Sequence, residues 1–236
     1  MDSTVKNSAF LDNEFDRVRE AVPELYPHLS VPRICTATIT CVLGKRSIDL
    51  TTLFSSQSGD IQIRTTKSSR GHEYRPFSNS ITMVMDAKKT IKVFTNGKLH
   101  ITGCRTIQHA HELVERLIAH MQWHEVAIVE TKLLTLNTSM VLIPKSIVNL
   151  HKLSVLFPRH SIKVTARYTP DIYQGVVLKV SHEPTHRILT ILCFYTGSFI
   201  VSGIQHPSEL EYALGVLGDT MKKILPEVVK SSSIAS

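Results

Sequence analysis

The chain has 236 residues, of which 42% are hydrophobic and 20% are charged, which is enough for one large domain or two lobes of roughly 100 residues each. With 10 Gly and 10 Pro, its composition excludes disordered, fibrous and low-complexity proteins. The longest apolar stretches, such as residues 188–195, are far shorter than a membrane span. We therefore expect a globular protein that does not cross a membrane.

Charge is distributed unevenly along the chain. Residues 1–30 hold six acidic and three basic side chains, and the remaining residues hold 24 basic and 14 acidic ones, a net charge of +10. A basic body of this kind favours a polyanionic partner, although positive charge can also serve solubility alone.

The cysteines and the N-terminus indicate the compartment. Cys35, Cys41, Cys104 and Cys193 are widely spaced and form no CxxC pair. The N-terminus also lacks a basic segment followed by an apolar one. We expect reduced thiols in a cytosolic or nuclear setting and no secretory signal.

Residues 1–30 form an acidic N-terminal extension. Its apolar residues Leu11, Phe15, Val18 and Val22 recur at helical spacing, which predicts a helix. This helix either packs on the body or extends from it; a third hypothesis is that it covers the basic surface of the free protein.

From residue 31 the same order of elements occurs twice. A β-rich run at 34–43 precedes a short helix at 47–56, and a second run at 126–143 precedes a helix at 146–157, each helix with a serine at its start. Each half then continues with two strands and an amphipathic helix. The apolar positions of these two helices are Ile107, Ala110, Val114, Leu117, Ile118 and Met121, and Leu210, Ala213, Leu214, Leu217, Met221 and Ile224.

The paired strands carry the clearest repeat. TIKVFTNGKLHITG at 90–103 and TILCFYTGSFIVSG at 190–203 lie 100 positions apart and align without a gap. The chain is therefore predicted to be a duplication, with one repeat at 31–124, a second at 125–230 and a tail at 231–236.

The apolar pattern selects the register of the first strand pair. A two-residue loop at Asn96 and Gly97 would place Val93 opposite His100, whereas a three-residue loop with Gly97 in the left-handed region places Lys92 opposite His100. Only the longer loop brings the apolar side chains onto one face, beneath the helix. The other face then displays Lys92, Phe94, Lys98, His100 and Thr102.

The second strand pair has a different outward face. Its matching positions are Leu192, Phe194, Ser198, Ile200 and Ser202. Large apolar groups that point away from the helices need a partner or a cover. This face is predicted to be either a binding surface or half of a larger core.

The duplicated motifs resemble the TATA-binding protein family over about residues 31–226. Besides the twin hairpins, YTPDIYQGV at 168–176 is similar to the second stirrup loop of the family, and EYRPF at 73–77 is similar to a shortened first stirrup. The insertion at 65–72 looks like that of TATA-binding-like factors from large nucleocytoplasmic DNA viruses. The resemblance implies an α+β fold, a pseudo-two-fold saddle of two tandem repeats in which a curved antiparallel sheet carries helices on its convex face.

The resemblance also implies a function and its residues. Family members are transcription initiation factors that bind A/T-rich promoter DNA in the minor groove and bend it by inserting aromatic wedges. The wedge positions carried over by motif are Phe77, Phe94, Tyr173 and Phe194. Because Tyr173 replaces a family Phe and has a hydroxyl that needs a partner, we expect a shallower kink there. The implied groove-floor and phosphate positions are Lys92, Lys98, His100, Thr102, Lys179, Leu192, Ile200 and Ser202.

Departures from the family pattern leave a second function open. Lys92 and His100 replace apolar floor residues, which predicts weaker sequence selectivity and a steeper salt dependence. The central asparagines of the family are missing near Ile34 and Leu134. The alternative is a saddle that binds proteins and inserts nothing into DNA.

The resemblance further implies protein partners and a location. Asp171 and Ile172 fall where the second stirrup of the family meets the B-type general initiation factor, and the RNA polymerase machinery follows from it. Self-association through the free saddle is a further possibility, and the implied location is nuclear, or a viral factory or virion if the chain is viral.

One motif suggests an enzyme. Residues 182–186 read HEPTH and match the H-E-x-x-H pattern of zinc proteases. That chemistry needs both histidines on one helix, and Pro184 would disrupt it. We therefore expect no metal, no cofactor and no catalysis.

Overall fold

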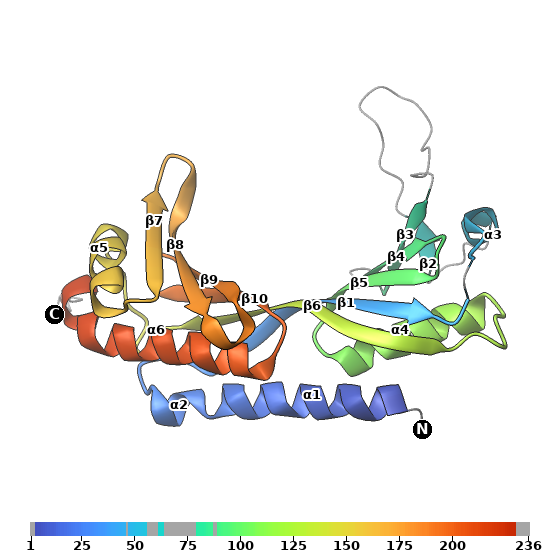
Figure 1. Ribbon diagram of the computed structural model, residues 1–236. Coiled ribbons are helices and arrows are strands. Elements are labelled where there is room, and N and C mark those ends of the chain that lie inside the picture. The colour runs from blue at the N-terminus through green and yellow to red at the C-terminus, as the bar shows by residue number, and fades with distance from the viewer. Residues whose placement is uncertain (1–2, 46, 56–60, 64–78, 87–88, 230–236) are drawn as a thin grey trace. The chain divides into compact units, whose positions relative to one another are not determined.

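The computed structural model describes residues 3–45, 47–55, 61–63, 79–86 and 89–229 (Figure 1). The chain divides into two units. Unit 1 comprises Met1–Asp12 and Thr36–Leu134, and unit 2 comprises Asn13–Cys35 and Thr135–Ser236. This division differs from the ranges predicted for the repeats, because it falls within a strand and because the N-terminal extension is shared between the two units.

The fold is α+β, and every strand pairing within the units is antiparallel. In unit 1 the strand order is β2-β3-β4-β5-β1, and in unit 2 it is β6-β10-β9-β8-β7. The elements are α1 Ser3–Glu20, α2 Val22–Leu25, β1 Arg33–Leu43, α3 Leu50–Ser55, β2 Ile61–Ile63, β3 Ser80–Met85, β4 Lys89–Phe94, β5 Lys98–Cys104, α4 Ile107–His120, β6 Ile128–Val141, α5 Leu150–His160, β7 Val164–Thr169, β8 Tyr173–His182, the 3-10 turn η1 Glu183–Thr185, β9 Arg187–Cys193, β10 Ser198–Ile204 and α6 Pro207–Val228.

Helices cover one face of the strands in each unit. In unit 1 the covering helix is α4, and in unit 2 the covering helices are α5 and α6 (Figure 1). The strand side chains that face α4 are completely buried, as the alternating pattern predicts for a half-covered antiparallel sheet. In β4 and β5 these side chains are Ile91, Val93, Leu99 and Ile101, all 0% exposed.

The hairpin register predicted for unit 1 is confirmed. Lys92 lies opposite His100, and residues 95–97 form the loop. Gly97 has φ +80°, and a Cβ at this position would come within 2.2 Å of the carbonyl oxygen of Lys45. Only glycine fits this conformation at this distance from another backbone segment.

The duplication recurs in hydrogen bonds 100 positions apart. The Ile48 amide donates to the Thr95 carbonyl in unit 1, and the Val148 amide donates to the Tyr195 carbonyl in unit 2, both at 2.8 Å. Gly197 likewise has a positive φ of 72°. The two units therefore share loop geometry as well as sequence.

The starts of the short helices differ from the prediction. The helices begin at Leu50 and Leu150 and not at the serines upstream. The reason is that acidic or amide side chains cap them: Asp49 accepts from the Thr51 amide at 2.9 Å, and Asn149 accepts from the Lys152 amide at 3.1 Å. These groups satisfy backbone donors that have no partner inside the helix.

The N-terminal extension packs on helices. In unit 1 the Asp12 carboxylate accepts from the first two amides of α4, those of Ile107 at 3.0 Å and Gln108 at 3.1 Å, where the helix dipole favours an anion. In unit 2 the Tyr26 ring lies so close to α6 that a Cβ at Gly218 would be 2.3 Å from its Cδ1. Both contacts are with helices, so they do not support the hypothesis that this extension covers the basic surface, which stays a prediction.

Candidate nucleic-acid interface

The face of unit 1 that α4 leaves uncovered is polar. Register places Thr82 opposite Lys92, Thr40 opposite His100, and Thr38 opposite Thr102. Their side chains therefore share one face, because directly opposed residues point to the same side of a sheet. We call this surface the open face of unit 1; it comprises Thr38, Thr40, Thr82, Lys92, Phe94, His100 and Thr102.

Phe94 is held on the open face by two neighbours. Its ring is half-buried and meets the His100 ring edge-on, with centroids 5.0 Å apart and planes at 62°. The Lys92 ammonium lies 5.1 Å from the centroid of the Phe94 ring, in cation–π contact. Phe94 therefore does not belong to the core beneath α4.

His100 combines partial burial with a positive neighbourhood. Burial lowers the pKa of His100 first, and the nearby Lys92 and Lys98 ammonium groups lower this pKa further. The imidazole is therefore neutral near pH 7 and keeps one nitrogen as a hydrogen-bond acceptor.

The open face of unit 2 is largely apolar. Leu192 lies opposite Ile200 on one side and Val177 on the other. Serines flank this apolar centre, since Ser139 pairs with Ile200 and Ser202 pairs with Thr190. We call this surface the open face of unit 2; it comprises Ser139, Val141, Val177, Thr190, Leu192, Phe194, Ile200 and Ser202 together with Tyr173 and Lys179 at its edge.

Two aromatic rings lie together at one end of this face. Tyr173 is 39% exposed, and its ring centroid is 6.1 Å from that of Phe194. Both rings lie over Gly175, where a Cβ would come within 2.9 Å of Tyr173 and 3.2 Å of Phe194. Gly175 therefore creates the space that both rings occupy, a role that sequence reasoning missed although glycine within a strand signals close approach.

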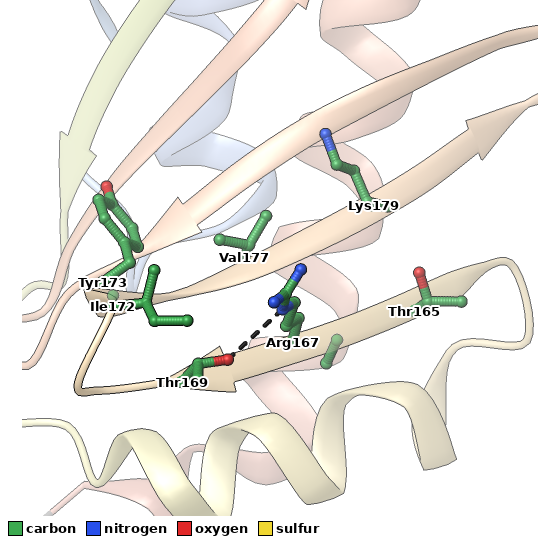
Figure 2. Close-up of a pocket in the computed structure, with 9 residues that line it drawn as sticks. Thr165, Arg167, Thr169, Ile172, Tyr173, Val177 and Lys179 are labelled. Atoms are coloured by element: carbon green, nitrogen blue, oxygen red, sulfur yellow. Dashed lines mark hydrogen bonds between the residues drawn. The ribbon is translucent and has the colours of Figure 1, made fainter.

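A groove of about 460 Å³ adjoins the aromatic pair, between β7 and β8 (Figure 2). Arg167 and Lys179 project from the same side of these strands. The Arg167 guanidinium donates to the Thr169 hydroxyl at 3.4 Å, and Lys179 donates to the Thr190 hydroxyl at 2.7 Å. Arg167 was not among the predicted residues; its signal was its place opposite Val177, which only the β7–β8 register reveals.

Four predicted positions remain to be described. Asp171 and Ile172 form the exposed turn between β7 and β8, where Ile172 is 76% exposed. Lys98 is exposed at the start of β5, beside the hairpin loop of unit 1. Phe77, with the rest of 73–77, lies outside the described residues.

The HEPTH segment forms a turn, and not the regular helix that zinc-protease chemistry needs. His182 ends β8, and residues 183–185 form η1 before His186 adopts the left-handed region. The His182 Nδ1 atom is 2.8 Å from the Thr185 hydroxyl, which donates to the buried Glu209 at 2.9 Å. The segment thus fastens the turn to the start of α6.

Neither a metal-binding group of side chains nor a membrane-spanning helix occurs in the described ranges. Among these residues, no three His, Cys, Asp or Glu side chains are grouped so that they could hold a metal ion. None of the helices in this part of the chain combines the length and the apolar character that crossing a membrane requires.

Comparisons with known proteins agree with this geometry. Residues 32–124 match the family model described as transcription factor TFIID, or TATA-binding protein. The TATA-box-binding protein of Thermoplasma volcanium is 23% identical over 157 residues, which is 65% of this chain and 81% of that protein. TATA-box-binding protein 1 of Methanosarcina acetivorans is 23% identical over 150 residues, 62% of this chain and 78% of that protein.

A solved structure bears out the fold class. The TATA-binding protein of Methanococcus jannaschii superposes with a TM-score of 0.60 at 16% identity, over 81% of this chain and 98% of that one. The predicted fold class is therefore confirmed. Over residues 32–124, and in its fold, the chain is therefore similar to the TATA-binding proteins, in agreement with the duplicated hairpins.

Proposed function

We propose that this protein is a transcription initiation factor that binds A/T-rich promoter DNA in the minor groove and bends it. The observation that carries the proposal is the pairing of the exposed Tyr173 ring with the half-buried Phe194 ring at the end of the unit 2 open face. Phe94 occupies the matching position of the duplicated hairpin in unit 1. The similarity to TATA-box-binding proteins supports the same function.

The aromatic rings supply the bending mechanism. A flat, rigid and apolar ring can enter between two base steps and replace part of the stacking, whose loss costs a few kcal/mol per step. The bent duplex then contacts more of the protein surface, which offsets the cost of deformation. In unit 2 the rings of Tyr173 and Phe194 are placed for such insertion, and Phe77 is the corresponding motif position in unit 1.

Basic side chains near the open faces would contact phosphates. Arg167 and Lys179 border the unit 2 open face, and Lys98 borders that of unit 1. Neutralised phosphates release counterions, so affinity should fall steeply as salt rises. This positive charge orients the duplex without reading its sequence.

The exposed turn between β7 and β8 is the proposed protein contact. Ile172 exposes an apolar side chain beside the acidic Asp171, a combination that suits a basic partner with an apolar pocket. We assign this turn to a B-type general initiation factor, which would connect the protein to RNA polymerase.

Bending and binding can be tested separately with one double variant. Phe94→Ala with Phe194→Ala should weaken binding in a gel shift and reduce bending, measured by energy transfer between dyes at the two DNA ends. Tyr195→Ala is the matched control, because Tyr195 is adjacent to Phe194 and 57% exposed but lies in the hairpin loop. An unchanged bend and affinity in the double variant would leave a protein-binding scaffold as the function.

A further inference from the structure

Among the differences between the two open faces, one concerns a directly opposed pair of residues at the centre of the hairpin. In unit 1 this pair is Lys92 and His100, and in unit 2, 100 positions later, it is Leu192 and Ile200. Both pairs occupy the same register of the same hairpin. The backbone is therefore matched, and only the chemistry of the pair is different.

The unit 1 pair lies among hydrogen-bonding groups. Thr40 is opposite His100 on β1, and its hydroxyl is buried without a hydrogen-bond partner in the described part of the chain. The hydroxyls of Thr90 and Thr102 bond each other at 2.5 Å. The Thr40 hydroxyl is enclosed and out of reach, so a ligand that supplies hydrogen bonds would meet the half-buried side chains of Lys92 and His100.

The minor groove offers such a ligand in one type of base pair. Every base pair presents acceptors there, but only G·C adds a donor, the guanine 2-amino group. Lys92 can donate to the acceptors of any base pair, whereas a neutral His100 can accept from the guanine amine. Leu192 and Ile200 can do neither, and an amine pressed against them would lose its hydration without compensation.

We propose that the open face of unit 1 accepts G·C base pairs, with His100 as the residue that receives the guanine 2-amino group, while the open face of unit 2 prefers A·T. The inference rests on the proposed minor-groove function and makes its DNA site asymmetric. One half of the site is A/T-rich, and the other half tolerates or favours guanine.

Inosine isolates the amine, because it pairs with cytosine but lacks the 2-amino group. Each position of an A/T-rich duplex is replaced in turn by G·C and by I·C, and affinity is measured by fluorescence anisotropy. In the parent protein one group of positions should bind G·C several-fold better than I·C, and another group should bind I·C about tenfold better.

Matched variants assign these groups to the units. His100→Ile should reverse the preference in the first group only, His100→Gln should keep it because the amide oxygen accepts, and Ile200→His should reduce the I·C preference in the second group only. A fall from about pH 7.5 to about pH 5.5 should weaken the guanine preference, since a protonated imidazole cannot accept. Lys92 and Lys98 are the charged groups beside this ring, and Phe94 and Thr40 are its other neighbours.

Two results would overturn the inference in different ways. An I·C preference at every position, equal in the parent protein and the variants, rejects it and leaves the proposed function standing. Failure of the parent protein to bind any of the duplexes rejects the proposed function as well.

Discussion

A comparison of the open faces of the two units separates the features that both repeats have kept from the residues that have diverged. Both keep the hairpin register, the left-handed glycine and an aromatic residue at the start of the hairpin loop or directly before it. They differ in the floor between these fixed points, which is rich in threonine and contains Lys92 and His100 in unit 1, and is centred on Leu192 and Ile200 in unit 2. Backbone geometry constrains the shared hairpin features. The floor residues are not constrained in this way, so their side chains can differ between the units according to what each face binds.

The largest expected effect on DNA affinity comes from substituting the aromatic residue of each unit singly. Phe194→Ala should weaken DNA binding by about 1–3 kcal/mol, because stacking on bases is lost at the more apolar face. Phe94→Ala should cost less, since the Phe94 ring already packs on His100 and Lys92. Equal losses in anisotropy titrations would mean that the two faces act alike.

A partner-binding variant tests whether the exposed turn of unit 2 acts independently of DNA contact. Asp171→Lys combined with Ile172→Ala should abolish the complex of protein, DNA and B-type factor, while DNA binding stays within about twofold, because Ile172 is 76% exposed in a turn. A mobility-shift assay with and without the factor measures both. Loss of the binary complex would place this turn against DNA.

A matched exchange of charge between the units can be measured through the salt dependence of DNA binding. Lys98→Ser should lower the slope of log affinity against log salt by about 1, and Ser198→Lys should raise it by a similar amount at the equivalent position. Titrations at several salt concentrations give both slopes. Unchanged slopes would show that neither hairpin start contacts a phosphate.

The smallest effect concerns pH and stability. Burial and the two lysines lower the pKa of His100 in the folded protein, so the unfolded chain binds this proton more readily. The contribution of His100 to stability is therefore complete above its ordinary pKa of about 6.5 and is lost as the pH falls from that value through the lower pKa of the folded protein. Urea unfolding at about pH 7.5 and about pH 5.5 should show a smaller loss in His100→Gln than in the parent protein.

Local patterns were sufficient for part of this structure. Alternation in β4 and β5 predicted the facing pair Lys92 and His100, and the repeat at 190–203 extended the prediction to unit 2. Each depended only on neighbours within one hairpin, where register follows from which side chains must be buried.

Other features depend on segments far apart in the chain. Arg167 joins the unit 2 interface only through the pairing of β7 with β8, and Thr40 meets His100 only through the pairing of β1 with β5. The contact of Tyr26 with Gly218 likewise has no periodic signal. Sequence patterns do not reveal such contacts, because each partner alone is compatible with several environments.

The packing of Tyr26 against α6 has a consequence for truncated forms of this protein. The family match starts at residue 32, so a fragment cut there would look complete by homology. It would nevertheless lose the buried side chains of Phe15, Val22 and Leu29, and it would uncover the part of α6 at Gly218 against which Tyr26 packs. Such a fragment would tend to aggregate or to bind unrelated proteins through the newly exposed apolar surface. Binding partners identified with it would therefore not be partners of the full chain.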